Sequence, residues 1–192
     1  EACHGPGARH VDWADAPRAL RWATWSDNGL VARLTEHRDA RWSLDAGATT
    51  ARRSTPRTTD REIETCAQCH ARRIHIADGY VAGAPLTDYY IPALIEPQLY
   101  HTDGQQLEEV YNYGSFLQSR MYRAGVTCAD CHDPHTQQLR APGNATCAQC
   151  HRPDVYDRPS HDFHPRTASR APRTGQARID TVVSCAACHM PT

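Results

Sequence analysis

The sequence contains few of the large apolar residues from which a conventional core is built. Its 192 residues include two Phe and two Met, and the mean hydropathy of −0.68 is clearly polar. No run of about eighteen apolar residues occurs, so we expect no transmembrane helix in this chain. The Arg residues are scattered without interleaved aromatic residues, which argues against a nucleic-acid-binding surface.

Cysteine and histidine carry the main pattern of the chain. The run Cys-x-x-Cys-His occurs four times, as Cys66–His70, Cys128–His132, Cys147–His151 and Cys185–His189. This run is the attachment signature of c-type haem. Two thiols bond covalently to the porphyrin vinyl groups, and the adjacent His is placed to ligate the iron from one face. We therefore expect four haems, attached through Cys66, Cys69, Cys128, Cys131, Cys147, Cys150, Cys185 and Cys188 and ligated by His70, His132, His151 and His189.

The ninth cysteine fits a fifth attachment site. Cys3 is followed by His4, and a Cys one position before Glu1 would complete the motif. We therefore expect a fifth haem there, and no Cys is left for a disulfide. Zinc is the competing ligand of such residues, but a zinc site draws four ligands to one ion, whereas here each Cys pair has its own His. A thioredoxin-like site would need a βαβ context and no His after the pair.

We expect a mostly α-helical fold with extensive loop and little or no β-sheet, built around the haems. Because haem supplies the apolar surface that the chain lacks, the chain without haem should be largely unfolded. The run Thr59 to Glu62 matches a capping box, which predicts a helix that carries the motif Cys66–His70. A second helix is predicted from Asp103 to Ala124, with an apolar face and Gly125 at its C-terminal cap.

Seven His lie outside the motifs: His10, His37, His75, His101, His135, His161 and His164. A second His on the far face of each iron would saturate the metal and leave no site for substrate, which suits electron transfer. We expect such ligands at His10, at His135 and at His164 or His161, with a slight preference for His164. His101 is a further candidate. His135 follows His132 by three residues, so it would serve a neighbouring haem, while His37 and His75 should be structural or exposed.

The chain should form one multihaem domain over residues 1–192, taken from a longer chain that continues at both ends. No signal peptide is present. Because covalent haem attachment takes place outside the bacterial cytoplasm, we expect that a signal peptide was removed and that the protein is periplasmic or extracellular. Residues 52–59, rich in Arg, Ser, Thr and Pro, are predicted to form an exposed loop.

Five stretches carry more specific motifs: Cys3–His10, Cys66–Arg73, Asp103–Gln105, Tyr113–Ser119 and Cys128–His135. With them the chain resembles multihaem cytochromes related to the tetrahaem electron carriers of ammonia oxidisers, a group often fused to tetratricopeptide repeats. The resemblance implies closely stacked haems, mostly with two axial His, and a role for His10 in crossing to another haem. It also implies one iron without a second ligand, which would match the haem at His70. The additional motif at Cys147–His151 departs from this pattern.

These observations favour electron transfer through a closely packed chain of four to five haems, exchanging electrons with redox protein partners. No Ser-His-Asp set, phosphate loop or carboxylate pair is found beside the motifs. One alternative is a multihaem oxidoreductase with an open iron that acts on a small nitrogen or sulfur species. Its pocket would use Arg72, Tyr89 and Tyr90. Another alternative is a subunit of an extracellular filament, in which copies of the chain stack end to end.

Overall fold

The computed structural model describes residues 2–161 and 184–190, so His164 lies outside the described residues. The chain divides into two compact units. Unit 1 comprises Glu1–Arg41 and Thr55–Asp130, and unit 2 comprises Trp42–Ser54 and Cys131–Thr192. The expectation of one domain over residues 1–192 stays a prediction. No helix in the described ranges is long and apolar enough to cross a membrane.

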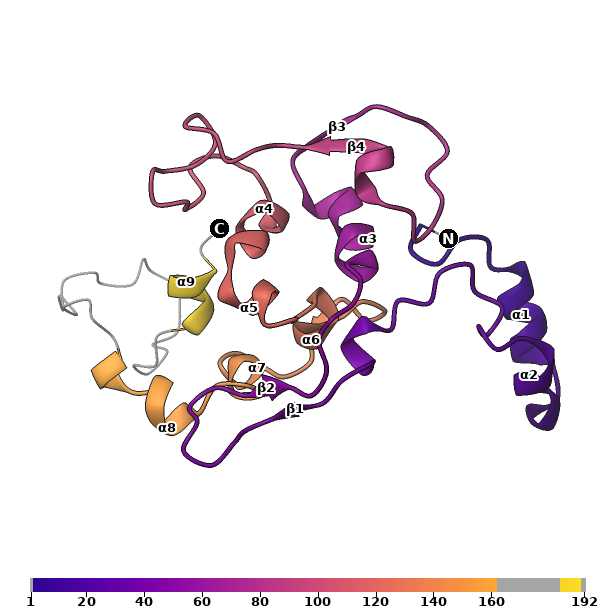
Figure 1. The fold of residues 1–192 in the computed structure, drawn as a ribbon, viewed down its shortest axis with the longest axis horizontal. Helices are drawn as coiled ribbons and strands as arrows, with labels where there is room; N and C mark the ends of the chain where they lie inside the picture. Colours follow the sequence, from indigo (N-terminus) through magenta and orange to yellow (C-terminus); the bar gives the residue numbers. More distant parts are fainter. Residues whose placement is uncertain (1, 162–183, 191–192) are drawn as a thin grey trace, which may run out of the picture. The chain divides into compact units, whose positions relative to one another are not determined.

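Unit 1 consists of short helices joined by loops (Figure 1). The helical elements that begin in it are α1 (Ala8–Asp15), α2 (Arg18–Thr24), η1 (Glu36–Arg38), α3 (Arg61–His70), η2 (Leu86–Asp88), α4 (Asn112–Gln118), α5 (Arg120–Arg123) and α6 (Cys128–Cys131). Its hairpin pairs β3 (Arg73–His75) with β4 (Tyr90–Pro92) in antiparallel register, so Ile74 lies opposite Ile91.

Unit 2 has even shorter elements. Its helices are α7 (Ala145–Ala148), α8 (Pro153–Tyr156), η3 (Pro159–His161) and α9 (Cys185–His189). Its strands form two antiparallel pairs, β1 (Trp42–Ser43) with β2 (Arg52–Arg53) and β5 (His132–Asp133) with β6 (Gln138–Leu139). The predicted class, mostly helix and loop with little sheet, is therefore confirmed for the part of the chain that the structure describes.

The core formed by side chains is small. In unit 1, Ala67 of α3 and Ala71 just after that helix pack with Leu86, and Tyr90 and Tyr113 lie against them. Many larger apolar side chains remain more than half exposed, among them Val11, Leu20, Val31, Ile74, Ile76, Val81, Ile91, Leu94 and Ile95. Exposed apolar surface on this scale is typical of chains that bind a large apolar partner. The thin core expected from the composition is present.

The helix predicted to carry the motif Cys66–His70 is confirmed, but the predicted capping residue is not. α3 begins at Arg61 and ends at His70, and Asp60 holds the N-cap position. The hydroxyl of Thr59, the expected cap, instead donates to Oε1 of Glu36 at 2.7 Å.

The helix predicted from Asp103 to Ala124 is wrong before Asn112. The carboxylate of Asp103 accepts a hydrogen bond from the backbone N–H of Gln105 at 3.0 Å, and Gly104 adopts a φ of +87°. Side chains that bond to nearby backbone in this way compete with the helix, and here the turn wins over apolar periodicity.

The second half of that predicted helix is interrupted once and then ends as expected. Ser119 separates α4 from α5, and its hydroxyl accepts the N–H of Tyr122 as an N-cap. Gly125 has a φ of +92°, and the N–H of Val126 reaches the carbonyl of Met121 at 3.0 Å. This is the glycine-terminated helix end that the sequence predicted.

Residues 52–59 are mostly exposed, as predicted, but they begin with strand β2 and the side chain of Arg57 is an exception. Its side chain is 9% exposed and its Nε donates to Oδ1 of Asp60 at 2.7 Å. One terminal nitrogen donates to the carbonyls of Tyr122 and Val126 at 3.1 and 2.9 Å, and the guanidinium lies 4.5 Å from the centre of the Tyr122 ring. Arg57 thereby fixes the turn that leads into Cys128 against the start of α3.

Candidate haem attachment sites

All four complete motifs are associated with helices. Cys66–His70 closes α3, Cys128 to Cys131 form α6, Cys147 lies in α7, and Cys185–His189 form α9. Helical spacing puts residues i, i+3 and i+4 on one side, so both sulfurs and the imidazole of a motif can face one porphyrin. All nine cysteines are free thiols. The residues therefore present the donor set that covalent haem attachment needs.

In unit 1 the first thiols of two motifs are neighbours. The S–H of Cys128 donates a hydrogen bond to the sulfur of Cys66, which lowers the pKa of the Cys66 thiol. The same bond, followed by burial, raises the pKa of Cys128. A backbone hydrogen bond joins the same two motifs. The N–H of Ala129 donates to Oε1 of Glu62 at 3.0 Å, and Glu62 lies one helical turn before Cys66. The starts of these two motifs lie side by side.

In unit 2 the other two complete motifs meet in the same way. The N–H of Cys185 donates to Oδ1 of Asn144 at 2.9 Å, three residues before Cys147. Burial raises the pKa of Cys185, and a hydrogen bond from its S–H to the sulfur of Cys147 raises it further. Burial also lowers the pKa of His151, and the nearby His189 adds to that effect.

Several predicted iron ligands have one ring nitrogen held by a hydrogen bond. Nδ1 of His4 lies 2.7 Å from the carbonyl of Ala32, and Nδ1 of His10 lies 2.7 Å from the carbonyl of Asn28. A carbonyl can only accept, so Nδ1 carries the proton and Nε2 keeps its lone pair. Metal-ligating histidines almost always show this arrangement. Both residues are therefore suited to bind iron through Nε2.

His161 faces the imidazole of the last motif. The ring centres of His161 and His189 are 6.1 Å apart, and the ring planes differ by 17°. Tyr156 supports the group, with its ring centre 5.5 Å from that of His151 and 5.3 Å from that of His161. The rings of His161 and His189 are stacked, so the structure brings His161 to the imidazole of the last motif.

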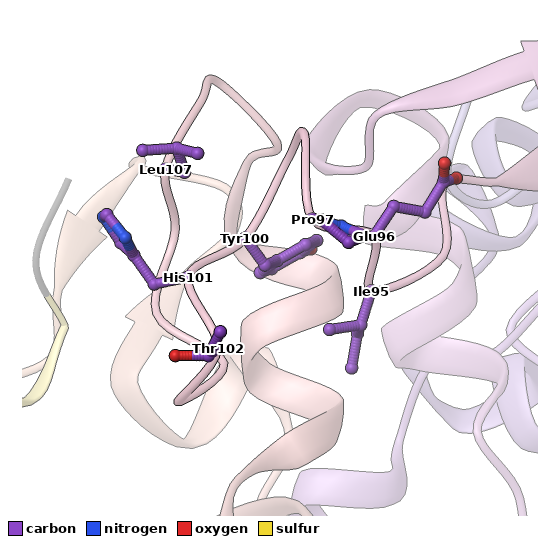
Figure 2. A pocket seen from close by; sticks show the side chains of 7 residues that line it. All are labelled: Ile95, Glu96, Pro97, Tyr100, His101, Thr102 and Leu107. Atoms are coloured by element: carbon purple, nitrogen blue, oxygen red, sulfur yellow. The ribbon is translucent and has the colours of Figure 1, made fainter.

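Two other predicted distal ligands in the described part of the chain, His135 and His101, lie in exposed positions. The side chain of His135 is 75% exposed, with Nδ1 3.8 Å from the carboxylate of Asp133. His101 is exposed and lines a pocket of about 370 Å³ with Ile95, Glu96, Pro97, Tyr100, Thr102 and Leu107 (Figure 2). Both remain predictions as ligands.

The residues proposed for an enzyme pocket have packing roles. Tyr90 lies under the guanidinium of Arg73 at 4.2 Å, and Tyr89 makes an edge contact with Tyr80. Arg72 donates to the carbonyl of Glu109 at 3.3 Å. None of the three residues named for that pocket, Arg72, Tyr89 and Tyr90, lines the cavity at His101.

His37 is held by hydrogen bonds on both ring nitrogens. Its Nδ1–H donates to Oε2 of Glu62 at 2.8 Å, and its Nε2 accepts from Nε of Arg38 at 3.0 Å. This agrees with the structural role expected from the sequence. Glu62 itself is 3% exposed and was missed as a site residue, as was Asn144. The capping-box pattern drew attention to Glu62, but no sequence signal showed its partner in the other motif.

Comparison with known proteins supports the motif assignment. A family model described as the doubled CXXCH motif matches residues 121–155, which contain Cys128–His132 and Cys147–His151. No curated protein and no solved structure matches the chain. With four motifs of this kind, the chain is a haem c-binding protein of the multihaem c-type cytochrome kind.

Proposed function

We propose that the protein transfers electrons through four to five covalently bound haems, most of them held between two His. The observation that carries this proposal is the grouping of the motifs, which begin side by side in two pairs joined by hydrogen bonds to Glu62 and Asn144. Each haem iron, when bound, accepts and releases one electron at a time. Motifs that begin side by side favour short distances between haem edges, and the small side-chain core leaves apolar surface for porphyrin to cover.

The chain offers a complete set of candidate iron ligands. On the near face we assign His4, His70, His132, His151 and His189, each adjacent to its attachment Cys. On the far face the candidates are His10, His101, His135, His161 and His164. The spacing of the two rings supports His161 as the partner of His189. The hydrogen bond to Asn28 supports His10, which would cross to a haem other than that of His4. A missing second ligand at His70 stays part of the proposal.

The proposal also covers the protein's relatives, its cellular location and its redox partners. The motifs support kinship with multihaem cytochromes related to the tetrahaem carriers of ammonia oxidisers. Covalent haem attachment supports a periplasmic or extracellular location, with redox proteins as partners. The oxidoreductase and the filament subunit are alternatives, and no contact among the described residues favours either of them.

Haem counting and spin state test the proposal together. The full chain would be produced with covalent haem attachment, and haem would be counted by intact mass and pyridine haemochrome. Paramagnetic resonance of the oxidised protein would then report the spin state of each iron. Four or five haems, almost all low-spin, are expected of an electron carrier. A high-spin population that changes on adding nitrite or hydroxylamine would favour the oxidoreductase instead, and fewer than four haems would contradict the assignment of the motifs.

A further inference from the structure

We propose that Glu62 and Asn144 are positioning residues that hold the complete motifs as two haem pairs. One pair would be attached through Cys66 and Cys128, and the other through Cys147 and Cys185. The inference rests on the proposed function, because pairs of haems exist only if the motifs carry haem. It adds which haems are neighbours and which side chains of this chain make them so.

Glu62 acts from within α3, four residues before Cys66. Its carboxylate is buried, and both oxygens have partners. Oε1 accepts the N–H of Ala129 at 3.0 Å, and Oε2 accepts the Nδ1–H of His37 at 2.8 Å. Ala129 is the second residue of α6, where backbone N–H groups have no partner inside the helix. Glu62 therefore supplies an acceptor for a backbone N–H at the start of the motif Cys128–His132. His37 fixes the orientation of the Glu62 carboxylate.

Asn144 does the same in unit 2. It occupies the N-cap position of α7, three residues before Cys147. Its Oδ1 accepts the N–H of Cys185 at 2.9 Å, at the first residue of α9, and its Nδ2–H donates to Oδ1 of Asp157 at 3.1 Å. The amide is thus held from one side by Asp157 and binds the start of the last motif from the other.

The two arrangements share one geometry. An oxygen placed three or four residues before the first Cys of one motif accepts a backbone N–H at the start of a second motif. The result in both cases is that the starts of two motifs lie side by side. Haem attachment adds each S–H across a vinyl C=C bond, forming a C–S bond and moving the thiol hydrogen to the other vinyl carbon. The hydrogen bonds made by Glu62 and Asn144 involve no sulfur, so they survive attachment and keep the two porphyrin edges together.

The test uses the full haem-loaded chain and circular dichroism in the Soret band, where neighbouring haems give a two-signed signal that isolated haems lack. Glu62→Ala should remove the contribution of one pair, Asn144→Ala that of the other, and the double variant both. Glu62→Gln keeps an acceptor oxygen for the N–H of Ala129 and should restore the signal of that pair. Glu64→Ala is a control on the same helix, because its carboxylate accepts from Leu86 and from no motif. Arg158→Ala is a control in unit 2, since its guanidinium donates to the carbonyl of Asp154 and to no motif.

The outcomes distinguish a failure of the positioning role from a failure of the proposed function. An unchanged Soret signal in both alanine variants, at full haem count, would overturn the positioning role, and so would an equal loss in the controls. If Glu62→Ala attaches fewer haems, peptide mass mapping decides: a loss confined to the motif at Cys128 supports the proposal, and a loss elsewhere overturns it. A native chain that carries no haem would refute the proposed function itself, independently of the pairing.

Discussion

Replacing His161 by alanine should open the iron of the last motif. The rings of His161 and His189 are 6.1 Å apart and within 17° of parallel, which makes His161 the proposed second ligand of that iron. Without His161 that iron keeps a single His ligand, and an iron with one imidazole and no strong sixth ligand becomes high-spin. Since one haem of four or five is affected, about 20–25% of the total iron should change spin state.

The assay is paramagnetic resonance of the oxidised protein, integrated against the total haem. Adding free imidazole should return the high-spin fraction to low spin, which distinguishes an open iron from a misfolded site. His75→Ala is the matched control, because the His75 ring contacts Tyr90 and its Nε2 lies 3.5 Å from Asp78. It should leave all haems unchanged. A His161→Ala protein with the same high-spin fraction as the native protein, at full haem count, would refute the reasoning and give the second ligand to another residue.

Three further predictions concern stability, measured by chemical denaturation of the haem-loaded chain. Arg57→Met should lower the free energy of unfolding by about 2–4 kcal/mol, because the carbonyls of Tyr122 and Val126 and one carboxylate oxygen of Asp60 each lose a hydrogen bond from a largely buried guanidinium; the 82% exposed Arg52, changed to Met, should cost at most about 0.5 kcal/mol. Burial raises the pKa of Tyr113 from 10 to about 12, so the unfolded chain loses this proton first and stability should fall between those pH values, a fall that Tyr113→Phe removes. Gly114→Ala should lower the free energy of unfolding by about 1–3 kcal/mol, because the added Cβ would meet the hydroxyl of the buried Tyr100. Gly7→Ala is the control, because a Cβ added there meets open space.

Each of these predictions has a result that would contradict it. Equal costs for Arg57→Met and Arg52→Met would mean that the buried hydrogen bonds contribute nothing. A Tyr113→Phe protein with the same loss of stability at alkaline pH would assign that loss to another group. Equal midpoints for Gly114→Ala and Gly7→Ala would show that the ring beside Gly114 moves without cost.

Sequence reasoning predicted the features that depend on neighbouring residues. The helix that carries Cys66–His70 and the glycine end at Gly125 both follow from patterns of a few residues, which backbone geometry enforces locally. The motifs themselves predicted the donor set of the haem sites in the same way. The helix from Asp103 was wrong for an equally local reason, because the turn at Gly104 competed with the apolar period and won.

The contacts that organise the motifs could not be predicted. Glu62 and Ala129 are 67 residues apart, and Asn144 and Cys185 are 41 apart, so no local pattern links them. The capping-box signature illustrates the limit. It marked Glu62 correctly as part of a helix start, yet the carboxylate binds the start of a different helix. A sequence pattern shows that a side chain can accept a hydrogen bond, and only the fold determines the donor.

Apolar periodicity has an unusual meaning in a chain of this kind. In most domains it marks the side chains that pack together, yet here Leu107 and Tyr111, on the predicted apolar face, are 47% and 44% exposed, and Ile74 is 67% exposed. A chain that encloses several porphyrins must place apolar side chains where its own residues do not cover them. Packing between side chains then specifies little of the arrangement. Directional contacts such as those of Glu62, Asn144 and Arg57 must supply the specificity, and this is why substitutions at buried polar positions should disturb the haem sites more than substitutions in the small core.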